Sequence, residues 1–290
     1  MSGRACLRVV TLGYLWRVAR AARRAGHRVI AGLEPSRSRT AAAREALARE
    51  GIETFAVPAV DEALAARLAG ADLLLVGAFG RILPAELLAL PRLGAFNVHP
   101  SLLPRWRGNN PIEWQILREE RTGGVTVHEI VPEVDAGPIV AAHSFPIGPD
   151  DDWEAVYERA HAAAEELLAG LLERDPRTWP RTPQPEGPPP LPVRRRRDGI
   201  VDWSRPADEI RRLVLAEGWR GWVRSHRPGG GEVVLQEVRV EEAPPGAEPG
   251  TVIEGGNAPL VAAGSGGLRL VRHRAVPPLA AGERLGEDPR

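Results

Sequence analysis

Short apolar segments alternate with segments of helical composition through the first hundred residues of the chain. This alternation constrains the fold, because successive strands that are joined by a helix lie parallel and are connected by a right-handed crossover. Strands are expected at residues 7–12, 28–33, 52–57, 72–79 and 93–98, and helices between them, at residues 40–50 and 61–68 among others. The chain is therefore predicted to begin with an α/β domain built on a mostly parallel sheet.

The remainder of the chain has a different pattern. Residues 124–131 and 138–147 are expected to form two more strands, and residues 153–173 a long helix. Residues 175–197 are rich in proline and end in four consecutive arginines, which is typical of a semi-rigid linker.

Beyond that segment the elements become short. A helix is expected at residues 207–216, and strands are expected at residues 232–240, 251–254, 260–263 and 268–273. Turns containing glycine or proline separate these strands, and this spacing favours a small β-barrel or sandwich. The predicted organisation is a catalytic domain over residues 1–174, a Pro/Arg-rich linker over 175–197 and a β-rich domain over 198–290.

Composition disfavours several classes of function. All 38 basic residues are arginine, so lysine Schiff-base chemistry and a Walker A loop are excluded. The only cysteine, Cys6, cannot form a disulfide framework or a cysteine-based zinc cluster. Gly13 is followed by Tyr14-Leu15-Trp16, so the G-x-G-x-x-G dinucleotide fingerprint is absent and no nicotinamide or flavin is expected.

The charge balance disfavours two kinds of partner. The formal net charge is zero, so no global field attracts nucleic acid or an anionic membrane. No apolar segment approaches the length that spans a membrane. These features predict a soluble cytoplasmic protein without a membrane partner.

Three polar residues suggest a site for chemistry. Asn97 and His99 stand two residues apart near the end of an expected strand, so an amide and an imidazole should lie side by side while Phe96 and Val98 point into the core. Asp135 follows in a tight turn. An amide, an imidazole and a carboxylate can together stabilise an oxyanion and move a proton. Ligands of open α/β sheets bind at such carboxyl ends of strands.

The residues around this trio resemble the signature of the folate-dependent formyltransferases. The resemblance rests on Asn97-Val98-His99-Pro100-Ser101-Leu102-Leu103-Pro104, Arg107-Gly108, Pro111, Trp114, Gly124-Val125-Thr126 and Asp135-Ala136-Gly137, with Gly77-Ala78-Phe79-Gly80-Arg81-Ile82-Leu83-Pro84 upstream. Beyond the linker, Asp198-Gly199-Ile200-Val201-Asp202-Trp203, Pro249-Gly250-Thr251-Val252 and Gly266-Gly267-Leu268 are similar to the carboxyl-terminal domain of methionyl-tRNA and 4-amino-arabinose formyltransferases. The resemblance implies a Rossmann-like catalytic domain followed by a small OB-like barrel.

The resemblance also implies a reaction, the transfer of a formyl group from N10-formyltetrahydrofolate to a primary amine. By resemblance, Asn97 and His99 would polarise the formyl oxygen, and Asp135 would pair with His99 and help to remove the amine proton. A carboxylate raises the pKa of a neighbouring histidine from about 6.5, so His99 is expected to donate as an imidazolium near neutrality.

The family's binding contacts are carried over in the same way. The pterin of the donor would lie against two segments, at Phe79, Arg81, Ile82 and Leu83 and at Val131, Val134 and Asp135. The candidate contacts to the acceptor are Ser101, Arg107, Asn109 and Asn110. No metal-ligand set is expected.

Several functions stay open at this stage. The favoured acceptor is a small amine such as an amino sugar or a natural-product intermediate. Methionyl-tRNA is disfavoured by the zero net charge and by the short connection at residues 36–42, where tRNA-acting members carry a longer, basic insertion. The alternatives are hydrolysis of formyltetrahydrofolate and an inactive folate-binding protein. A homodimer is also left open, and His128 is assigned a structural role because it alternates with Thr126 and Ile130.

Overall fold

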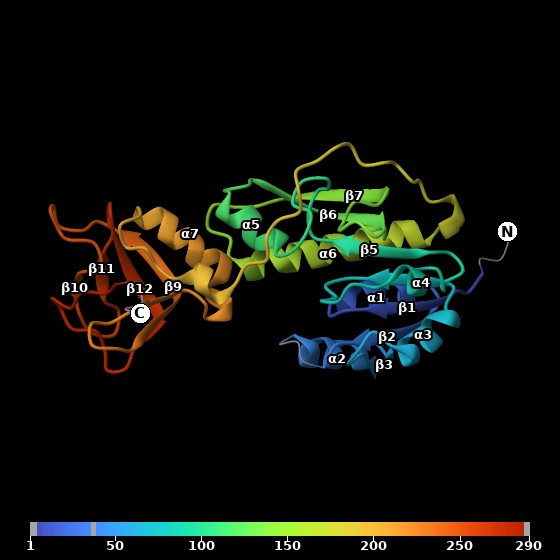
Figure 1. Ribbon diagram of the computed structural model, residues 1–290, viewed down its shortest axis with the longest axis horizontal. Coiled ribbons are helices and arrows are strands. Elements are labelled where there is room, and N and C mark those ends of the chain that lie inside the picture. Colours follow the sequence, from blue (N-terminus) through green and yellow to red (C-terminus); the bar gives the residue numbers. More distant parts are fainter. Residues whose placement is uncertain (1–4, 36–38, 287–290) are drawn as a thin grey trace. The chain divides into compact units, whose positions relative to one another are not determined.

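The computed structural model describes residues 5–35 and 39–286 (Figure 1). Its contacts divide into two compact units. The first comprises the described residues of Met1–Pro111, Thr122–Pro146 and Tyr157–Leu191, and the second comprises Ile112–Arg121, Ile147–Val156 and the described residues of Pro192–Arg290. The domain boundaries predicted above, 174/175 and 197/198, stay a prediction.

The first unit is built on a seven-stranded sheet with the order β3-β2-β1-β4-β5-β6-β7. Its strands are β1 (Arg8–Leu12), β2 (Arg28–Leu33), β3 (Glu53–Ala56), β4 (Leu73–Val76), β5 (Ala95–His99), β6 (Thr122–Glu129) and β7 (Ile139–Pro146). The helices along this part of the chain are α1 (Trp16–Arg24), α2 (Thr40–Arg49), α3 (Glu62–Ala69), α4 (Ala85–Leu88), α5 (Pro111–Leu117), α6 (Trp153–Leu172) and the 3-10 turn η1 (Pro176–Thr178).

The directions of the strands follow from their connections. β1 to β5 pair in parallel, whereas β6 is antiparallel to β5 and to β7. The segment between β6 and β7 contains no helix, and such a short connection suits antiparallel neighbours. β4 is buried along its whole length, as its uninterrupted Leu73-Leu74-Leu75-Val76 run requires for a strand covered on both faces.

The core of this unit follows the alternation of strand residues. Leu74 and Val76 on β4 join a cluster that contains Leu64 and Leu68 of α3 and Leu87 of α4. The intervening residues of β4 are equally buried on the opposite face. Burial on both faces leaves the strand ends and the loops that follow them as the places for polar chemistry.

The second unit contains a five-stranded antiparallel sheet with the order β10-β11-β12-β9-β8. Its strands are β8 (Arg224–His226), β9 (Glu232–Glu241), β10 (Val252–Glu254), β11 (Leu260–Ala262) and β12 (Gly267–Arg274). Its helical segments include η2 (Arg196–Gly199), α7 (Ala207–Glu217) and η3 (Gly218–Arg220), together with nearly all of α5. Arg284 bridges to Thr251 beside β10 and Gly286 bridges to His226 of β8, so one late segment pairs with both edges of the sheet. The predicted fold class is confirmed.

Within residues 5–35 and 39–286 no helix is both long and apolar enough to cross a membrane.

Candidate active site

Asn97 and His99 occupy the carboxyl end of β5, as the sequence predicts. Phe96 and Val98 are buried at 0% and 2% exposure, so the alternation of the strand directs the two polar residues to the other face. In the antiparallel pairing of β5 with β6, His128 is the partner of Asn97. The register therefore brings a second imidazole to the amide.

Asp135 lies in the loop between β6 and β7 and has a left-handed φ of 50°. Its Oδ1 accepts a hydrogen bond from Asn97 Nδ2 at 3.2 Å, and its Oδ2 accepts one from the Gly108 backbone N–H at 2.8 Å. Nδ1 of His99 lies 3.4 Å from Oδ2. The structure thus brings together the three residues that the sequence analysis proposed as catalytic.

His128 was assigned a structural role from the sequence, but its Nε2 lies 3.4 Å from Asp135 Oδ1 and 3.2 Å from Asn97 Nδ2. Nδ1 of His128 lies 3.0 Å from the carbonyl oxygen of Glu129, which can only accept, so Nδ1 carries a proton. His128 belongs to the polar cluster, and only the strand register reveals this.

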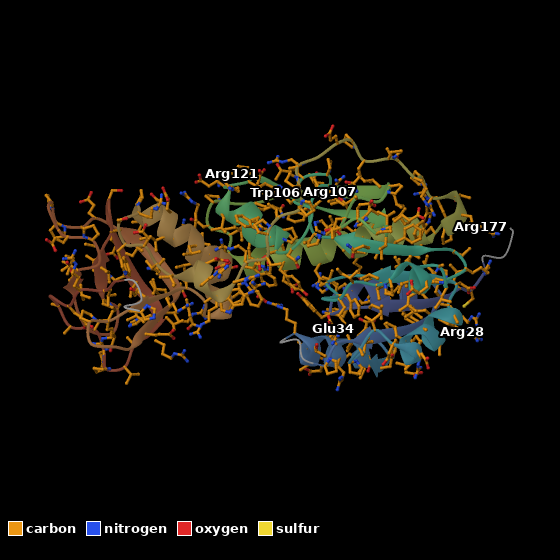
Figure 2. The ribbon with its side chains drawn as sticks, in the orientation of Figure 1. Arg28, Glu34, Trp106, Arg107, Arg121 and Arg177 are labelled. Atoms are coloured by element: carbon orange, nitrogen blue, oxygen red, sulfur yellow. The ribbon has the colours of Figure 1, made fainter. Side chains whose placement is uncertain are left out.

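The loop after β5 closes the other side of His99. Nε2 of His99 lies 2.8 Å from the carbonyl oxygen of Trp106, so the Nε2 proton is donated to that carbonyl. Trp106 and Arg107 follow one another on this loop (Figure 2). Trp106 and Asn110 have left-handed φ angles of 62° and 59°. Non-glycine residues in this region are strained, and such strain clusters at functional sites.

The electrostatics of the cluster correct one expectation. Burial lowers the pKa of His99 below its usual range and outweighs the opposing effect of Asp135, so the prediction of an imidazolium near neutrality is wrong in direction. Burial alone would raise the pKa of Asp135, but His99, His128 and the Gly108 N–H together hold it well below its usual range.

These protonation states define what the cluster can do. Asp135 is ionised, and the neutral ring of His99 donates Nε2–H to Trp106 while Nδ1 faces the carboxylate. The two acceptors, Nδ1 of His99 and Oδ2 of Asp135, therefore face each other across 3.4 Å. A proton placed on Nδ1 is stabilised by the Asp135 carboxylate, while the Trp106 carbonyl accepts from Nε2 at the other end of the ring. The arrangement suits uptake of a proton from a reacting group.

The residues predicted to contact the acceptor differ in their surroundings. Ser101 is 0% exposed and its hydroxyl donates to the Arg105 carbonyl, so it stabilises its own turn, and a contact from Ser101 to the acceptor stays a prediction. Asn109 is exposed, and Asn110 is half-buried. Arg107 donates from Nε and Nη2 to Gln184 Oε1, a partner that the sequence analysis did not identify.

The residues predicted to contact the donor include apolar side chains that are unusually exposed. Ile82 is 83% exposed and Val134 is 45% exposed, whereas Leu83 is buried in the core. Phe79 and Val131 are half-buried. Val134 precedes Asp135 in the chain, and exposed apolar side chains offer contact area for a partly apolar ligand.

Glu34 fixes the first of these segments and was not predicted. It follows β2 (Figure 2), is 4% exposed, and accepts a hydrogen bond from the Gly80 N–H at 2.7 Å. Its Oε1 lies 3.3 Å from Nε of Arg81, whose Nη2 also donates to the Pro58 carbonyl. Arg81 is therefore held beside Glu34 and Pro58.

Among the described residues, no group of three or more histidine, cysteine, aspartate or glutamate side chains could hold a metal ion.

Family models match both parts of the chain. The model described as "Formyl transferase" matches residues 32–172, and the model described as "Formyl transferase, C-terminal domain" matches residues 195–276. The chain belongs to the formyl transferase family. The family resemblance inferred from the sequence is thereby confirmed.

Relatives with assigned names are similar over most of the chain. The methionyl-tRNA formyltransferase of Methylobacillus flagellatus is 36% identical over 217 residues, which cover 72% of this chain and 69% of the relative. HypX from Aquifex aeolicus, solved in complex with tetrahydrofolic acid, aligns with 94% of this chain and 45% of its own, at a TM-score of 0.70 and 23% identity. A sugar N-formyltransferase from a Shewanella species aligns with 79% of this chain and 96% of its own, at a TM-score of 0.63 and 18% identity. The two structural likenesses concern the fold.

Proposed function

We propose that this formyltransferase transfers a formyl group from N10-formyltetrahydrofolate to a primary amine of a small molecule, such as an amino sugar or a natural-product intermediate. The observation that supports it is the placement of the Asp135 carboxylate, with Asn97 Nδ2 at 3.2 Å from Oδ1 and His99 Nδ1 at 3.4 Å from Oδ2. An amine that becomes an amide loses a proton, and this pair of groups is arranged to receive one.

The roles of the residues follow from their charges. His99 is the proton acceptor, because burial keeps its ring neutral and Asp135 stabilises the imidazolium that forms. Asn97 Nδ2 provides the side-chain donor nearest to the carboxylate, and His99 becomes a donor at Nδ1 once it has taken up the proton; such donors stabilise charge that develops on a carbonyl oxygen. His128 and Gly108 keep Asp135 ionised through contacts to its two oxygens.

The donor would be held by residues 79–83 and 131–135. When bound, a reduced folate supplies an activated formyl group. Ile82 and Val134 offer it exposed apolar surface, and Glu34 and Pro58 hold the side chain of Arg81. HypX, a structural neighbour, was solved with tetrahydrofolic acid, and this supports a folate as the donor.

The arginine run 194–197 bears on the choice of acceptor. Arg194 Nε lies 2.7 Å from Oε1 of the fully buried Glu217, and Arg196 Nη2 lies 2.9 Å from Oε2 of Glu232. Charges that are paired within the protein release fewer counterions from a nucleic acid, so they add less to its binding. The short connection at residues 36–42 also supports a small acceptor, although residues 36–38 lie outside the described residues.

The second candidate is formylation of methionyl-tRNA. It is supported by relatives with that name, among them the one from Geotalea uraniireducens, which is 36% identical over 223 residues. The presence of a carboxyl-terminal formyltransferase domain is compatible with either acceptor.

One assay separates the two candidates. The enzyme is given N10-formyltetrahydrofolate together with methionyl-tRNA or with a panel of amino sugars and nucleotide-linked amino sugars, and formylated product is quantified. We expect product from at least one small amine and little from methionyl-tRNA. Efficient formylation of methionyl-tRNA, unchanged when Arg194 and Arg196 are replaced by glutamine, would establish the second candidate instead.

A further inference from the structure

The side chain of Gln184 connects two loops of the candidate active site. Its Oε1 accepts hydrogen bonds from Arg107 Nε at 3.0 Å and Nη2 at 2.6 Å. Its Nε2 donates to the carbonyl oxygens of Asp135 at 2.8 Å and Gly137 at 2.7 Å. A carboxamide has two N–H donors and one oxygen with two lone pairs, so this amide uses its full hydrogen-bonding capacity on the two loops.

The segment that presents Gln184 is itself fixed on both sides. Thr182 pairs with Ile139 of β7 through backbone hydrogen bonds of 2.8 and 2.9 Å. Leu191 donates its N–H to the Arg107 carbonyl at 2.8 Å and bridges to Gly108. Residues 182–191 therefore run along the catalytic unit between two pairing points, and the amide is held at a defined place although the segment has the composition of a linker.

The loop that carries Asp135 needs external contacts to hold its shape. Asp135 adopts a left-handed φ of 50°, which is unfavourable for a residue with a Cβ. Gly137 approaches the β6 backbone so closely that a Cβ there would lie 1.8 Å from the Glu129 carbonyl oxygen. The two carbonyls that Gln184 binds lie on either side of Ala136, so one amide fixes the peptide planes of residues 135–136 and 137–138.

A second chain of contacts connects Gln184 to Asp135. Arg107, which Gln184 binds, precedes Gly108, whose N–H donates to Oδ2 of Asp135 at 2.8 Å. Oδ2 is the oxygen that faces His99 Nδ1. Gln184 therefore acts on the backbone of Asp135 directly and on its carboxylate through Arg107 and Gly108.

We propose that Gln184 is a positioning residue for formyl transfer, which sets the Asp135 carboxylate against His99 by holding the two loops in register. It does not touch the reacting groups. This inference rests on the proposed function, because it assigns Gln184 a role only through Asp135. Displacing a catalytic group by about 1 Å can cost about a hundredfold in rate, so loss of the amide should reduce turnover more than donor binding.

Three variants separate the contacts. Gln184→Ala removes all four hydrogen bonds, whereas Gln184→Glu keeps an acceptor for Arg107 and places a second acceptor against the two loop carbonyls. Glu186→Ala is the matched control, since Glu186 is an exposed residue of the same segment. We expect kcat to fall at least tenfold in both Gln184 variants, KM for the donor to change less than threefold, and Glu186→Ala to match the wild type.

A double-mutant cycle tests whether Gln184 acts through Asp135. If it does, adding Gln184→Ala to Asp135→Asn should slow the enzyme less than twofold beyond Asp135→Asn alone, because the carboxylate to be positioned is already absent. A wild-type kcat in Gln184→Ala, or losses that multiply in the double variant, would overturn the proposal. Full activity of Asp135→Asn would instead contradict the proposed function itself.

Discussion

Nε2 of His128 lies 3.4 Å from Oδ1 of Asp135, on the carboxylate oxygen opposite to the one that faces His99. Asp135 is thus flanked by two buried imidazoles, at 2% exposure for His128 and 4% for His99. Nε2 of His128 also lies 3.2 Å from Asn97 Nδ2, and Asn97 in turn donates to Oδ1 of Asp135.

This relationship predicts a role for His128 in turnover. His128→Ala should lower kcat about tenfold or more, because the imidazole that lies within 3.4 Å of both Asn97 and Asp135 is removed, and Asp135 loses a neighbour that lowers its pKa. Steady-state kinetics with a saturating donor measure the effect. His143→Ala is the control, since His143 lies exposed on β7. Equal activity of the two variants would return His128 to the structural role that the sequence suggested.

Folate binding should stabilise the protein measurably. A ligand that binds only the folded state raises the free energy of unfolding by RT ln(1 + [L]/Kd), about 2.7 kcal/mol at a hundred times Kd. A folate analogue should therefore raise Tm, and Ile82→Asp should reduce that shift, because it places a charge on the most exposed apolar side chain of residues 79–83. Val276→Asp, at a comparably exposed position outside the site, should leave the shift unchanged. No Tm rise at saturating analogue, with a rise for another one-carbon donor, would reassign the donor.

His161 predicts a pH-dependent stability. It is 1% exposed, and burial, followed by the charge of Arg17, lowers its pKa from about 6.5 to about 3. Between these two pKa values His161 is protonated in the unfolded chain but not in the folded protein. The free energy of unfolding must therefore fall as the pH falls below about 6.5. The folded ring accepts from the Arg17 N–H through Nε2, which protonation would prevent.

The expected size of this loss in the free energy of unfolding follows from the linkage between proton binding and folding. Between pH 6.5 and 5 the loss should approach about 1.5 kcal/mol from this group, because the slope cannot exceed about 1.4 kcal/mol per pH unit for one proton. The free energy of unfolding can be measured by urea titration at several pH values. It should fall less steeply with decreasing pH for His161→Gln than for the wild type. His143→Gln, at an exposed histidine, should keep the wild-type slope. Parallel slopes for wild type and His161→Gln would show that the folded ring protonates freely.

The sequence predicts the strands well where burial imposes an apolar pattern. The expected strand at 28–33 coincides with β2, and the expected helix at 153–173 matches α6 within one residue. β8 was not predicted, because its residues, Arg224-Ser225-His226, have no apolar alternation, although Ser225 is fully buried. α5, which begins at Pro111, was not predicted from the sequence either.

The site was predictable only in part, for a physical reason. Asn97 and His99 are close in sequence, so strand periodicity places them together without knowledge of the fold. His128 joins them through an antiparallel register, and Gln184 joins through a proline-rich segment that pairs with β7. Neither position shows in a local pattern. The predicted rise in the pKa of His99 was wrong for a related reason. The direction of the shift depends on burial, and burial is a property of the assembled fold.

The central claim is that Asn97, His99 and Asp135 perform formyl transfer to an amine, and single-turnover kinetics test it most directly. The formyl donor and a competent amine are mixed with wild type, with Asn97→Ala, His99→Ala and Asp135→Ala, and with the exposed control Asp208→Ala, while circular dichroism verifies folding. Each of the three site variants should transfer the formyl group at least about a hundredfold more slowly than wild type, and Asp208→Ala at the wild-type rate. A folded variant of any of the three that transfers the group at nearly the wild-type rate would contradict the account.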